Sequence, residues 1–520
     1  MVKEQKIWVA TTESGEQISL LPKLANRHGL IAGATGTGKT ITLKVLAESF
    51  SDLGVPVFLA DVKGDLAGMV RPGEDSEDMQ KRIEKFGLRE AGFSYTAYPS
   101  CFWDIYGKKG IQLRTTISEM GPLLLSRILN LNDLQTDLMS IVFKIADDQS
   151  LLLIDTKDLK SMLNYVSENH AEFEVDYGKI SPVSISAIVR AVVALEMEGA
   201  DQFFGEPALN VTDLFATGEG GKGMINILDS QSLISNGRLY STFLLWLMSE
   251  LFEDLPEVGD REKPKMVFFF DEAHLLFEDA PKELVDKIEQ VVKLIRSKGV
   301  GIYFVTQNPR DIPDGVLAQL GNKIQHGLHA YTPAEQKAVK AAAEGFRENP
   351  ALDTYETLLA LGTGEALISF LEESGAPGIV QKVNVLPPQS KMGSIDESLR
   401  DSVIKDAMLY TRYAKAVDPD SAYEFLQRKG LEAEKAKEQE AADKEAAKQA
   451  AKDEAAKKKA EEADARAKKR AAKSVTTTVA GTVGREVGKQ VGKKFGSFGK
   501  TLGGNLGASL GRNILGTLFK

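Results

Sequence analysis

The sequence predicts an α/β fold with a mostly parallel sheet, and three observations lead to this prediction. Short apolar runs alternate with helical segments between residues 29 and 61 and again between residues 223 and 307. A glycine-rich stretch joins the first apolar run to a helix, and later apolar runs end on polar side chains. Strands that alternate with helices form parallel sheets covered on both faces, because each crossover lays a helix over the sheet.

Five elements are predicted before residue 62. They are strands at 5–10 and 17–21 around the turn Ser14-Gly15, an apolar strand at 29–33, a helix from Lys39 to about Asp52, and a second apolar strand at 55–61. The run at 55–61 is too short for a helix and ends on a carboxylate.

A mainly helical insertion is expected in the middle of the chain. Residues 112–215 show helical spacing of apolar positions and few strand signals. The α/β pattern then resumes, with strands predicted at 223–229, 265–274, 301–307 and 364–371, and helices at 239–255 and 284–299. The strand at 364–371 is expected to be the last, and Gly299 is expected to cap the second helix.

The composition of the chain changes at residue 431. Residues 431–473 are almost entirely Ala, Lys and Glu, which is typical of a solvated single helix or a coiled-coil arm. Residues 481–516 carry a glycine every three or four positions. This pattern predicts either a helix whose small-residue stripe packs on another helix or on a membrane surface, or a segment that stays disordered until it binds.

These changes along the chain predict its domain organisation. We expect the first part of the α/β core (1–111), the helical insertion (112–215), the second part of the core (216–390), a helical extension (391–430), the Ala/Lys/Glu arm (431–473) and a Gly-rich basic tail (474–520).

Charge and cysteine content exclude several classes of protein. The net charge is −10, although residues 474–520 carry seven basic side chains and one acidic one, so the rest of the chain is strongly acidic. An acidic body argues against a generally basic nucleic-acid surface but leaves room for a local basic channel. The single cysteine, Cys101, excludes an internal disulfide and a zinc site made of cysteines. No signal peptide or membrane span is predicted, so a cytoplasmic location is expected.

The strongest motif is GATGTGKT at residues 33–40, which fits the pattern GxxxxGK[ST] between an apolar strand and a helix. Glycines let backbone N–H groups surround phosphates, the lysine reaches the β- and γ-phosphates, and the threonine hydroxyl can bind Mg²⁺. The alternative is a Gly-rich turn before a helix. The predicted ATP-binding residues are Gly33, Ala34, Thr35, Gly36, Thr37, Gly38, Lys39 and Thr40.

A pair of carboxylates follows the apolar run VFFF. Asp271 and Glu272 should lie at the carboxyl end of a buried strand, where ligands bind in open α/β sheets. Asp271 can hold Mg²⁺, together with Thr40, and Glu272 can act as general base toward water. The alternative is a strand that ends in solvated acids, with Asp271 as a helix cap.

Two further candidates flank the strand at 301–307. Gln307 ends that strand, where its amide can contact the γ-phosphate or the attacking water, although it can also simply cap the strand. Arg296 lies near the end of the preceding helix, where an arginine also interacts favourably with the helix dipole. The residues alone favour this second interpretation of Arg296.

The order of these motifs resembles that of the HerA–FtsK superfamily of hexameric DNA-pumping ATPases, and most closely the HerA-like bacterial proteins. The resemblance covers residues 22–72 and 223–385, and LIRSKGVGIYFVTQNPRDIP is its most specific segment. It implies a RecA-like P-loop core, ATP and Mg²⁺ as ligands, a homo-hexamer, double-stranded DNA as substrate, and a catalytic role for Arg296 at a neighbouring subunit's nucleotide.

The resemblance also draws attention to residues outside the main motifs. Asp61 and Asp65 align with an acidic site after the second strand of the family, although a turn explains the sequence VKGD equally well. His28 precedes the P-loop strand, as a family histidine often does. Gly364 and Glu365 lie in the family's last-strand segment.

The sequence departs from the family in its attachments. HerA proteins generally carry a β-barrel before the core, and the roughly 28 residues before the P-loop strand are too few for one. The membrane spans and winged helix of FtsK proteins are not visible either. The preferred function is therefore an oligomeric, ATP-driven motor on double-stranded DNA. The alternatives are an ATPase that remodels protein substrates and a nucleotide-controlled scaffold whose tail recruits a protein partner.

Overall fold

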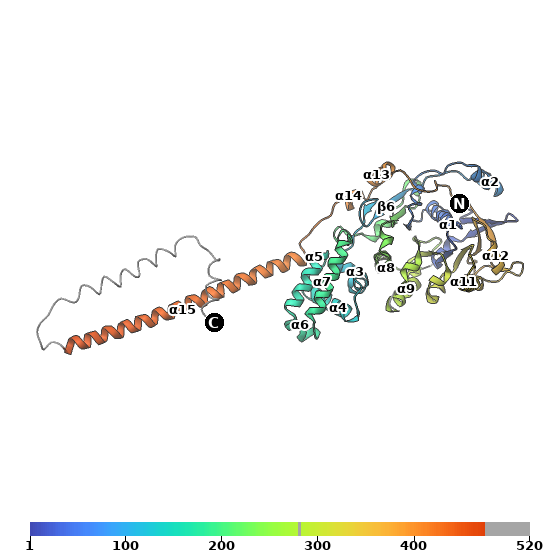
Figure 1. Ribbon diagram of the computed structural model, residues 1–520. Coiled ribbons are helices and arrows are strands. Elements are labelled where there is room, and N and C mark those ends of the chain that lie inside the picture. Colours follow the sequence, from blue (N-terminus) through green and yellow to red (C-terminus); the bar gives the residue numbers. More distant parts are fainter. Residues whose placement is uncertain (260, 279–281, 474–520) are drawn as a thin grey trace. The chain divides into compact units, whose positions relative to one another are not determined.

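The computed structural model describes residues 1–259, 261–278 and 282–473 (Figure 1). The chain divides into two compact units, Met1–Lys429 and Gly430–Lys520. The first unit contains all the predicted chemical motifs, and the second is described as far as Lys473.

A single mixed sheet organises the first unit. Its strands, among the described residues, are β1 (Val2–Lys3), β2 (Lys6–Thr12), β3 (Gln17–Leu20), β4 (Gly29–Ala32), β5 (Val57–Asp61), β6 (Ser100–Asp104), β7 (Ile111–Gln112), β8 (Ile225–Asp229), β9 (Met266–Phe270), β10 (Val300–Thr306), β11 (Asn322–His326), β12 (Glu365–Ser369) and β13 (Gln381–Val385). Their order is β1-β2-β13-β12-β11-β4-β10-β9-β5-β8-β6-β7, with β3 paired to β2.

The sheet is parallel from β11 through β4, β10, β9, β5, β8 and β6 to β7, and antiparallel from β11 to β1. The P-loop strand β4 lies between β10 and β11, and Thr306 pairs with Ala32 at its end. The carboxyl ends of β4, β9 and β10 therefore meet at one edge of the sheet. This is the α/β fold with a mostly parallel RecA-like P-loop core that the sequence predicts.

Helices cover the sheet and form the insertion. They are α1 (Lys39–Asp52), α2 (Glu77–Lys85), α3 (Ile117–Ile128), α4 (Asp133–Asp148), α5 (Thr156–Glu168), α6 (His170–Tyr177), α7 (Pro182–Met197), α8 (Gly237–Asp254), α9 (Lys282–Ile295), α10 (Asp314–Leu317), α11 (Pro333–Glu344), α12 (Thr354–Ala360), α13 (Glu397–Asp406), α14 (Tyr410–Tyr413) and α15 (Ala422–Lys473). Helices α3 to α7 lie together beside the sheet (Figure 1), and α3 packs on α8 of the core.

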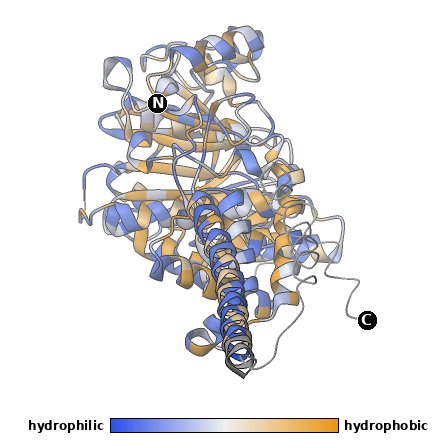
Figure 2. Ribbon diagram, turned by 90° about the vertical axis from the view of Figure 1, so that its left-hand side faces the viewer, coloured by the Kyte–Doolittle hydropathy of each residue, from blue (hydrophilic) through white to orange (hydrophobic). Residues whose placement is uncertain are grey.

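The central strands form the core because they are apolar along most of their length. Every residue of β4, β5, β8, β9 and β10 is buried, and Figure 2 shows the strands mainly in the hydrophobic colour. Strands buried on both faces are expected in a parallel sheet that carries helices on each side. Phe269 on β9 and Tyr303 on β10 pack together with ring centroids 5.2 Å apart and their planes tilted by 33°.

The structure corrects one predicted element and adds several. The strand at 364–371 is not the last, because β13 follows it and pairs with both β12 and β2. Strands β6, β7 and β11 were also not predicted. β11 has the sequence NKIQH, and because most of its side chains are polar, the pattern of apolar residues does not predict a strand there. It nevertheless pairs with β4 and β12 and is largely buried.

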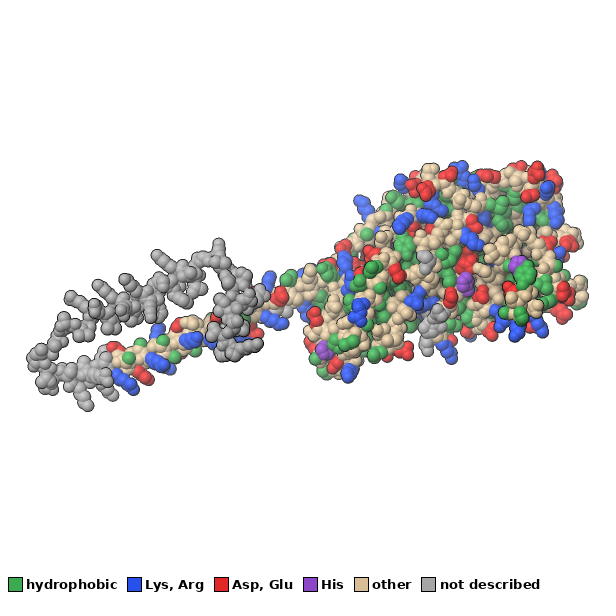
Figure 3. Space-filling view, viewed as in Figure 1, with side chains coloured by type: hydrophobic (Ala, Val, Ile, Leu, Met, Phe, Trp, Pro, Cys, Tyr) green, Lys and Arg blue, Asp and Glu red, His purple; other side chains and the backbone are tan. Residues whose placement is uncertain are grey.

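The second unit, in its described part, is the continuation of helix α15. Its side chains are exposed where the structure describes them, and both basic and acidic side chains lie along the helix (Figure 3). The Gly-rich segment 481–516 lies outside the described residues. No single helix of the described chain is long and apolar enough to span a membrane, and only the bent pair α6–α7 meets the criterion of length and composition.

Candidate active site

The loop between β4 and α1 has a backbone that requires glycine. Gly33, Gly36 and Gly38 have φ values of 152°, 81° and 118°, and a Cβ on Gly33 would come within 2.5 Å of the His326 Cβ. Gly38 caps α1 without a side-chain hydrogen bond. Because the first N–H groups of a helix have no partner within the helix, the start of α1 turns unpaired donors toward the loop, which suits a phosphate group.

Lys39 extends its ammonium back over this loop. Its Nζ donates hydrogen bonds to the carbonyl oxygens of Gly33 at 2.6 Å and Ala34 at 3.1 Å. Partial burial lowers the lysine pKa, an effect that the nearby Asp271 and Glu272 carboxylates oppose. The loop thus keeps a cation beside the N–H groups at the start of α1.

Neighbouring strands hold the loop in place. The Ala34 N–H donates to the Gly327 oxygen at 2.9 Å, just after β11. The Gly364 N–H, just before β12, donates to the Thr37 oxygen at 3.0 Å. Gly364, which the family resemblance singled out, therefore touches the loop directly. Thr35 and Gly36 form the exposed crest of the loop.

Asp271 follows β9 at the same edge of the sheet. Burial, followed by the charge of the adjacent Glu272, raises the pKa of its carboxyl to about 7. The Asp271 Oδ1 accepts from the Glu272 N–H at 3.0 Å, and the Tyr240 hydroxyl on α8 donates to the Asp271 carbonyl at 2.7 Å. A half-buried carboxylate with so few hydrogen bonds suits a cation ligand, since a cation would offset the cost of its charge.

Glu272 has a left-handed backbone, with φ 48° and ψ 47°. Such a conformation is costly for a residue with a side chain, and it turns the carboxylate toward the end of β10. There the Glu272 Oε2 lies 3.5 Å from the Gln307 Nε2 and 3.4 Å from the His274 Nδ1. Two of the predicted catalytic side chains, Glu272 and Gln307, are thus in direct contact.

The Asp61 and Asp65 carboxylates form no hydrogen bond or ion pair with these groups where the structure describes them. The Asp61 carboxylate is buried and accepts hydrogen bonds from the N–H groups of Gly64 at 2.7 Å, Asp65 at 3.1 Å and Leu66 at 3.1 Å. It therefore closes a turn after β5. Burial, followed by the Asp65 charge, raises the pKa of Asp61 to about 6. This is the turn that the sequence VKGD offered as an alternative.

Arg296 and His28 lie at the opposite edge of the sheet. Arg296 comes just before β10, whose seven residues separate it from the loop by about 20 Å. Its side chain is exposed and has no hydrogen bond or ion pair to any described residue. His28 comes just before β4, is buried with φ 58°, and accepts from the Ile302 N–H through Nδ1 at 3.0 Å.

His326 is a site residue that sequence reasoning missed. Its Nδ1 donates to the Glu365 carbonyl at 3.0 Å, so its Nε2 accepts from the Thr42 hydroxyl at 2.8 Å. Burial lowers the pKa of the ring to about 4, so it stays neutral. His326 thus connects α1 to β12 beneath the loop. Its sequence signal is a single histidine in NKIQH, a segment whose polar residues do not predict a strand.

Three curated relatives share part of their length with this chain. The probable helicase MJECL08 of Methanocaldococcus jannaschii is 30% identical over 146 residues, 27% of this chain and 26% of that protein. The DNA import protein CedB of Sulfolobus acidocaldarius is 24% identical over 358 residues, 68% and 51% respectively. The DNA double-strand break repair helicase HerA of Sulfurisphaera tokodaii is 21% identical over 365 residues, 68% and 64%. The chain thus spans less than two thirds of each relative.

Solved structures and a family model complete the comparison. The plasmid coupling protein TrwB in complex with ADP and Mg²⁺ has a TM-score of 0.49 to this chain at 13% identity, over 76% of this chain and 92% of that one. The model of the family described as Helicase HerA-like C-terminal matches residues 6–509, which include the P-loop, the carboxylate pair and Gln307. The resemblance inferred from the motifs is confirmed, and the chain belongs to the Helicase HerA-like C-terminal family.

Proposed function

We propose that this protein hydrolyses ATP at the edge of the sheet where the P-loop, Asp271, Glu272 and Gln307 converge. The observation that carries the proposal is the meeting of a glycine-dependent phosphate cradle with a carboxylate held against a glutamine amide at 3.5 Å. Fold alone would not support it, since one fold serves many functions. This arrangement supplies both the phosphate grip and the polar groups that orient a water.

Each side chain has a distinct role in this proposal. The γ-phosphate displaces the Gly33 and Ala34 carbonyls from the Lys39 ammonium, which then stabilises charge on the leaving β–γ bridge. Glu272 accepts a proton from the attacking water. Gln307 orients both that water and the Glu272 carboxylate, because its amide carries a donor and an acceptor.

Magnesium fits the residues present at this edge. The described residues contain no cluster of three or more His, Cys, Asp or Glu side chains able to hold a metal. A magnesium ion would therefore be held by the Thr40 hydroxyl, Asp271, water and the nucleotide's own phosphates, the mixture of oxygen ligands it prefers. When bound, it supplies charge neutralisation at the transferring phosphoryl group.

We further propose that the protein works as a ring-shaped oligomer that moves double-stranded DNA. Arg296 supports the ring, because it lies about 20 Å along β10 from its own P-loop and is free to reach another subunit. Relatives named as a DNA import protein and a DNA repair helicase support the substrate. The proposal includes a cytoplasmic location and a protein partner for the tail.

The deciding experiment measures the rate of ATP hydrolysis by the full chain with and without duplex DNA. A DNA motor should be stimulated by linear duplex DNA, and Glu272→Gln should lower both the basal and the stimulated rate at least about a hundredfold. Stimulation by protein but not by DNA would instead support the remodelling ATPase. Slow ATP hydrolysis that neither DNA nor protein stimulates, together with nucleotide-dependent assembly, would support the scaffold.

A further inference from the structure

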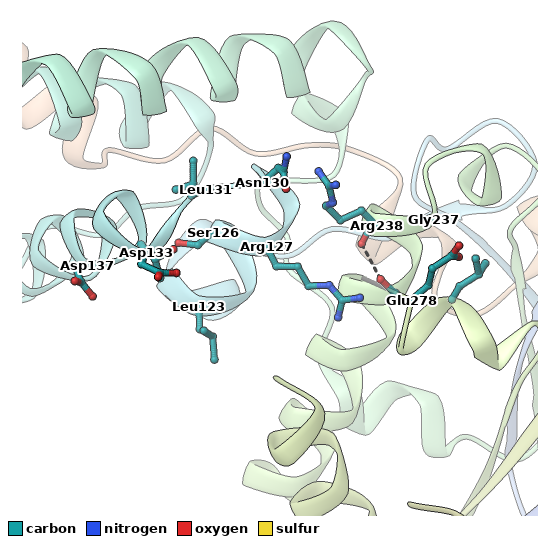
Figure 4. A pocket seen from close by; sticks show the side chains of 13 residues that line it. Leu123, Ser126, Arg127, Asn130, Leu131, Asp133, Asp137, Gly237, Arg238 and Glu278 are labelled. Carbon is teal, nitrogen blue, oxygen red and sulfur yellow. Dashed lines mark hydrogen bonds between the residues drawn. The ribbon is translucent and has the colours of Figure 1, made fainter. Parts of the chain in front are cut away.

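A cavity of about 540 Å³ lies between the helical insertion and the core (Figure 4). Helices α3 and α4 and the turn between them form one wall, and the start of α8 with the segment after Glu272 forms the other. Two arginines, Arg127 from α3 and Arg238 from α8, extend into the space between these walls (Figure 4).

Arg127 is only partly satisfied by the protein. Its Nη2 donates to the Leu276 carbonyl at 3.3 Å, whereas its Nη1 is buried and has no hydrogen-bond partner among the described residues. Burial, followed by the charge of Arg238, lowers the pKa of the guanidinium to about 10. A buried donor without a partner is rare and costly, so it calls for a ligand as its explanation.

Arg238 brings a second charge to the same cavity. Its side chain is exposed, and its guanidinium forms no hydrogen bond or ion pair with a described residue. Three acids also line the cavity, Asp133 and Asp137 on α4 and Glu278 after Glu272. Neither arginine forms an ion pair with any of these acids where the structure describes them, so both cations keep their capacity to bind an anion.

Both arginines are connected to the Asp271–Glu272 pair through short chains of backbone and hydrogen bonds. Arg127 holds the carbonyl of Leu276, which ends the 3₁₀ helix η7 (Ala273–Leu276), and the Leu275 N–H donates to the Glu272 carbonyl at 3.0 Å. Arg238 lies two residues before Tyr240, whose hydroxyl holds the Asp271 carbonyl at 2.7 Å. A ligand that draws the two arginines together therefore acts on the backbone on both sides of Glu272.

We propose that Arg127 and Arg238 form a phosphate-binding site, for a nucleic-acid phosphodiester or a free phosphate compound, that adjusts the position of Glu272. Two guanidinium groups match the several oxygens of a phosphate and favour it over a single-charge ligand. Binding at the cavity stands independently of the proposed function. The effect on Glu272 rests on that function, because it presupposes ATP hydrolysis.

The test uses the full chain saturated with Mg²⁺ and a non-hydrolysable ATP analogue, so that the P-loop is filled. Binding of a labelled duplex oligonucleotide is measured by fluorescence anisotropy at several salt concentrations, and binding of pyrophosphate by calorimetry. Arg238→Gln should weaken binding of the probe that occupies the cavity, DNA or pyrophosphate, at least about tenfold. If the ligand is DNA, the slope of log affinity against log salt should fall by about 0.9, the value for one lost phosphate contact.

Matched variants distinguish loss of this site from a general loss of positive charge and from misfolding. Arg190→Gln on α7 removes an exposed arginine of the insertion outside the cavity and should leave affinity and slope unchanged. Arg127→Gln should act like Arg238→Gln, and Arg238→Lys, which retains the charge, should recover part of the affinity. Because Arg238 has no described partner, its variants should fold even if those of Arg127 do not.

The outcomes identify the ligand or reject the site. Loss of DNA binding in Arg238→Gln supports a phosphodiester as the ligand, and loss of pyrophosphate binding alone supports a free phosphate compound. Loss of pyrophosphate binding alone would support the site even if DNA does not stimulate ATP hydrolysis. Failure of the proposed function and failure of this site can therefore be told apart. Equal binding of both probes by wild type and Arg238→Gln overturns the proposal.

Discussion

Individual residues at the sheet edge show how local strain and hydrogen bonds prepare a site. Gly33, Gly36 and Gly38 adopt positive φ, and Glu272 adopts a left-handed conformation that its side chain disfavours. The surrounding strands fix these conformations, because the loop bonds to Gly327 on one side and to Gly364 on the other. The grouping of unusual backbone conformations at one edge of the sheet is what makes this edge a functional candidate.

The P-loop lysine and the strand-end glutamate have separable effects. Lys39→Ala should abolish Mg²⁺-dependent ATP hydrolysis and weaken ATP binding, because it removes the cation that the loop holds. Glu272→Gln should still bind ATP yet hydrolyse it at least about a hundredfold more slowly, because the amide cannot accept the proton. Single-turnover hydrolysis and nucleotide-binding assays check both. Glu257→Gln, an exposed carboxylate away from the site, is the control, and full activity in either site variant would refute the assignment.

Burial of His28 should make the stability of the fold depend on pH. Burial lowers its pKa from 6.5 to about 4, so in mild acid the unfolded chain takes up a proton that the folded chain refuses. The free energy of unfolding should therefore fall as pH falls through 6.5 toward 4, by about 2 kcal/mol from this residue between pH 7.5 and 5. His28→Asn, whose side chain tolerates the positive φ, should lose that part of the pH dependence in urea unfolding.

The exposed His329 is the matched control for this experiment. His329→Asn should keep the wild-type dependence of unfolding free energy on pH. An identical dependence in wild type and His28→Asn would show that burial of His28 contributes nothing to acid sensitivity.

At the scale of elements, the insertion helices and helix α15 are stabilised in different ways. The insertion helices bury apolar faces, and all of them except α6 are capped by a side chain, such as Thr116 and Asn132 in full capping boxes. Beyond Lys429, helix α15 has no such face in its described part. It is supported by pairs such as Glu440–Lys444 at 2.6 Å and Glu454–Lys458 at 3.4 Å, each contributing about 0.3–0.5 kcal/mol.

The start of α15 belongs to the first unit. The buried Asp158 Oδ1 on α5 accepts from the Ser421 hydroxyl at 2.6 Å and the Tyr423 N–H at 2.8 Å. The Lys429 ammonium donates to the Tyr165 hydroxyl at 2.7 Å. These contacts define where the chain can be shortened without exposing a buried carboxylate.

Removal of residues 431–520 should leave ATP hydrolysis within about twofold of wild type, since the site and the contacts of Asp158 remain. Removal of residues 421–520 should in addition lower the free energy of unfolding by about 1–3 kcal/mol, because Asp158 loses two donors. Thermal unfolding and ATPase assays of both truncations check this. Loss of folding in the longer protein, 1–430, would mean that the tail is part of the ATPase itself.

At the scale of the whole molecule, the sheet separates the proposed catalytic groups onto opposite edges. Lys39, Asp271, Glu272 and Gln307 lie at the carboxyl ends of the strands, and Arg296 lies at the amino end of β10. One subunit cannot bring Arg296 to its own nucleotide without unfolding the strand between them. If Arg296 acts in hydrolysis, it must act on a neighbour.

A mixing experiment tests this prediction. Arg296→Ala should bind ATP normally and hydrolyse it about 10³–10⁵-fold more slowly, the range measured for arginine fingers. Co-assembly of Arg296→Ala with Lys39→Ala should restore some activity, because a subunit with an intact P-loop can receive the arginine of its neighbour. Native mass spectrometry must verify the mixed oligomers. Verified mixtures without any rescue, or a fully active monomer, would reject the trans arginine.

The sequence by itself determined the parallel core, the P-loop, the carboxylate pair and Gln307. These features depend on local patterns: apolar runs of strand length, glycines at fixed spacing, and polar residues where such runs end. Only the tertiary structure decided that Asp61 closes a turn, that the polar segment NKIQH is a buried strand carrying His326, that β13 follows the expected last strand, and that Arg127 and Arg238 share a cavity. Those facts arise from contacts between residues far apart in the chain, whose partners no local pattern can identify.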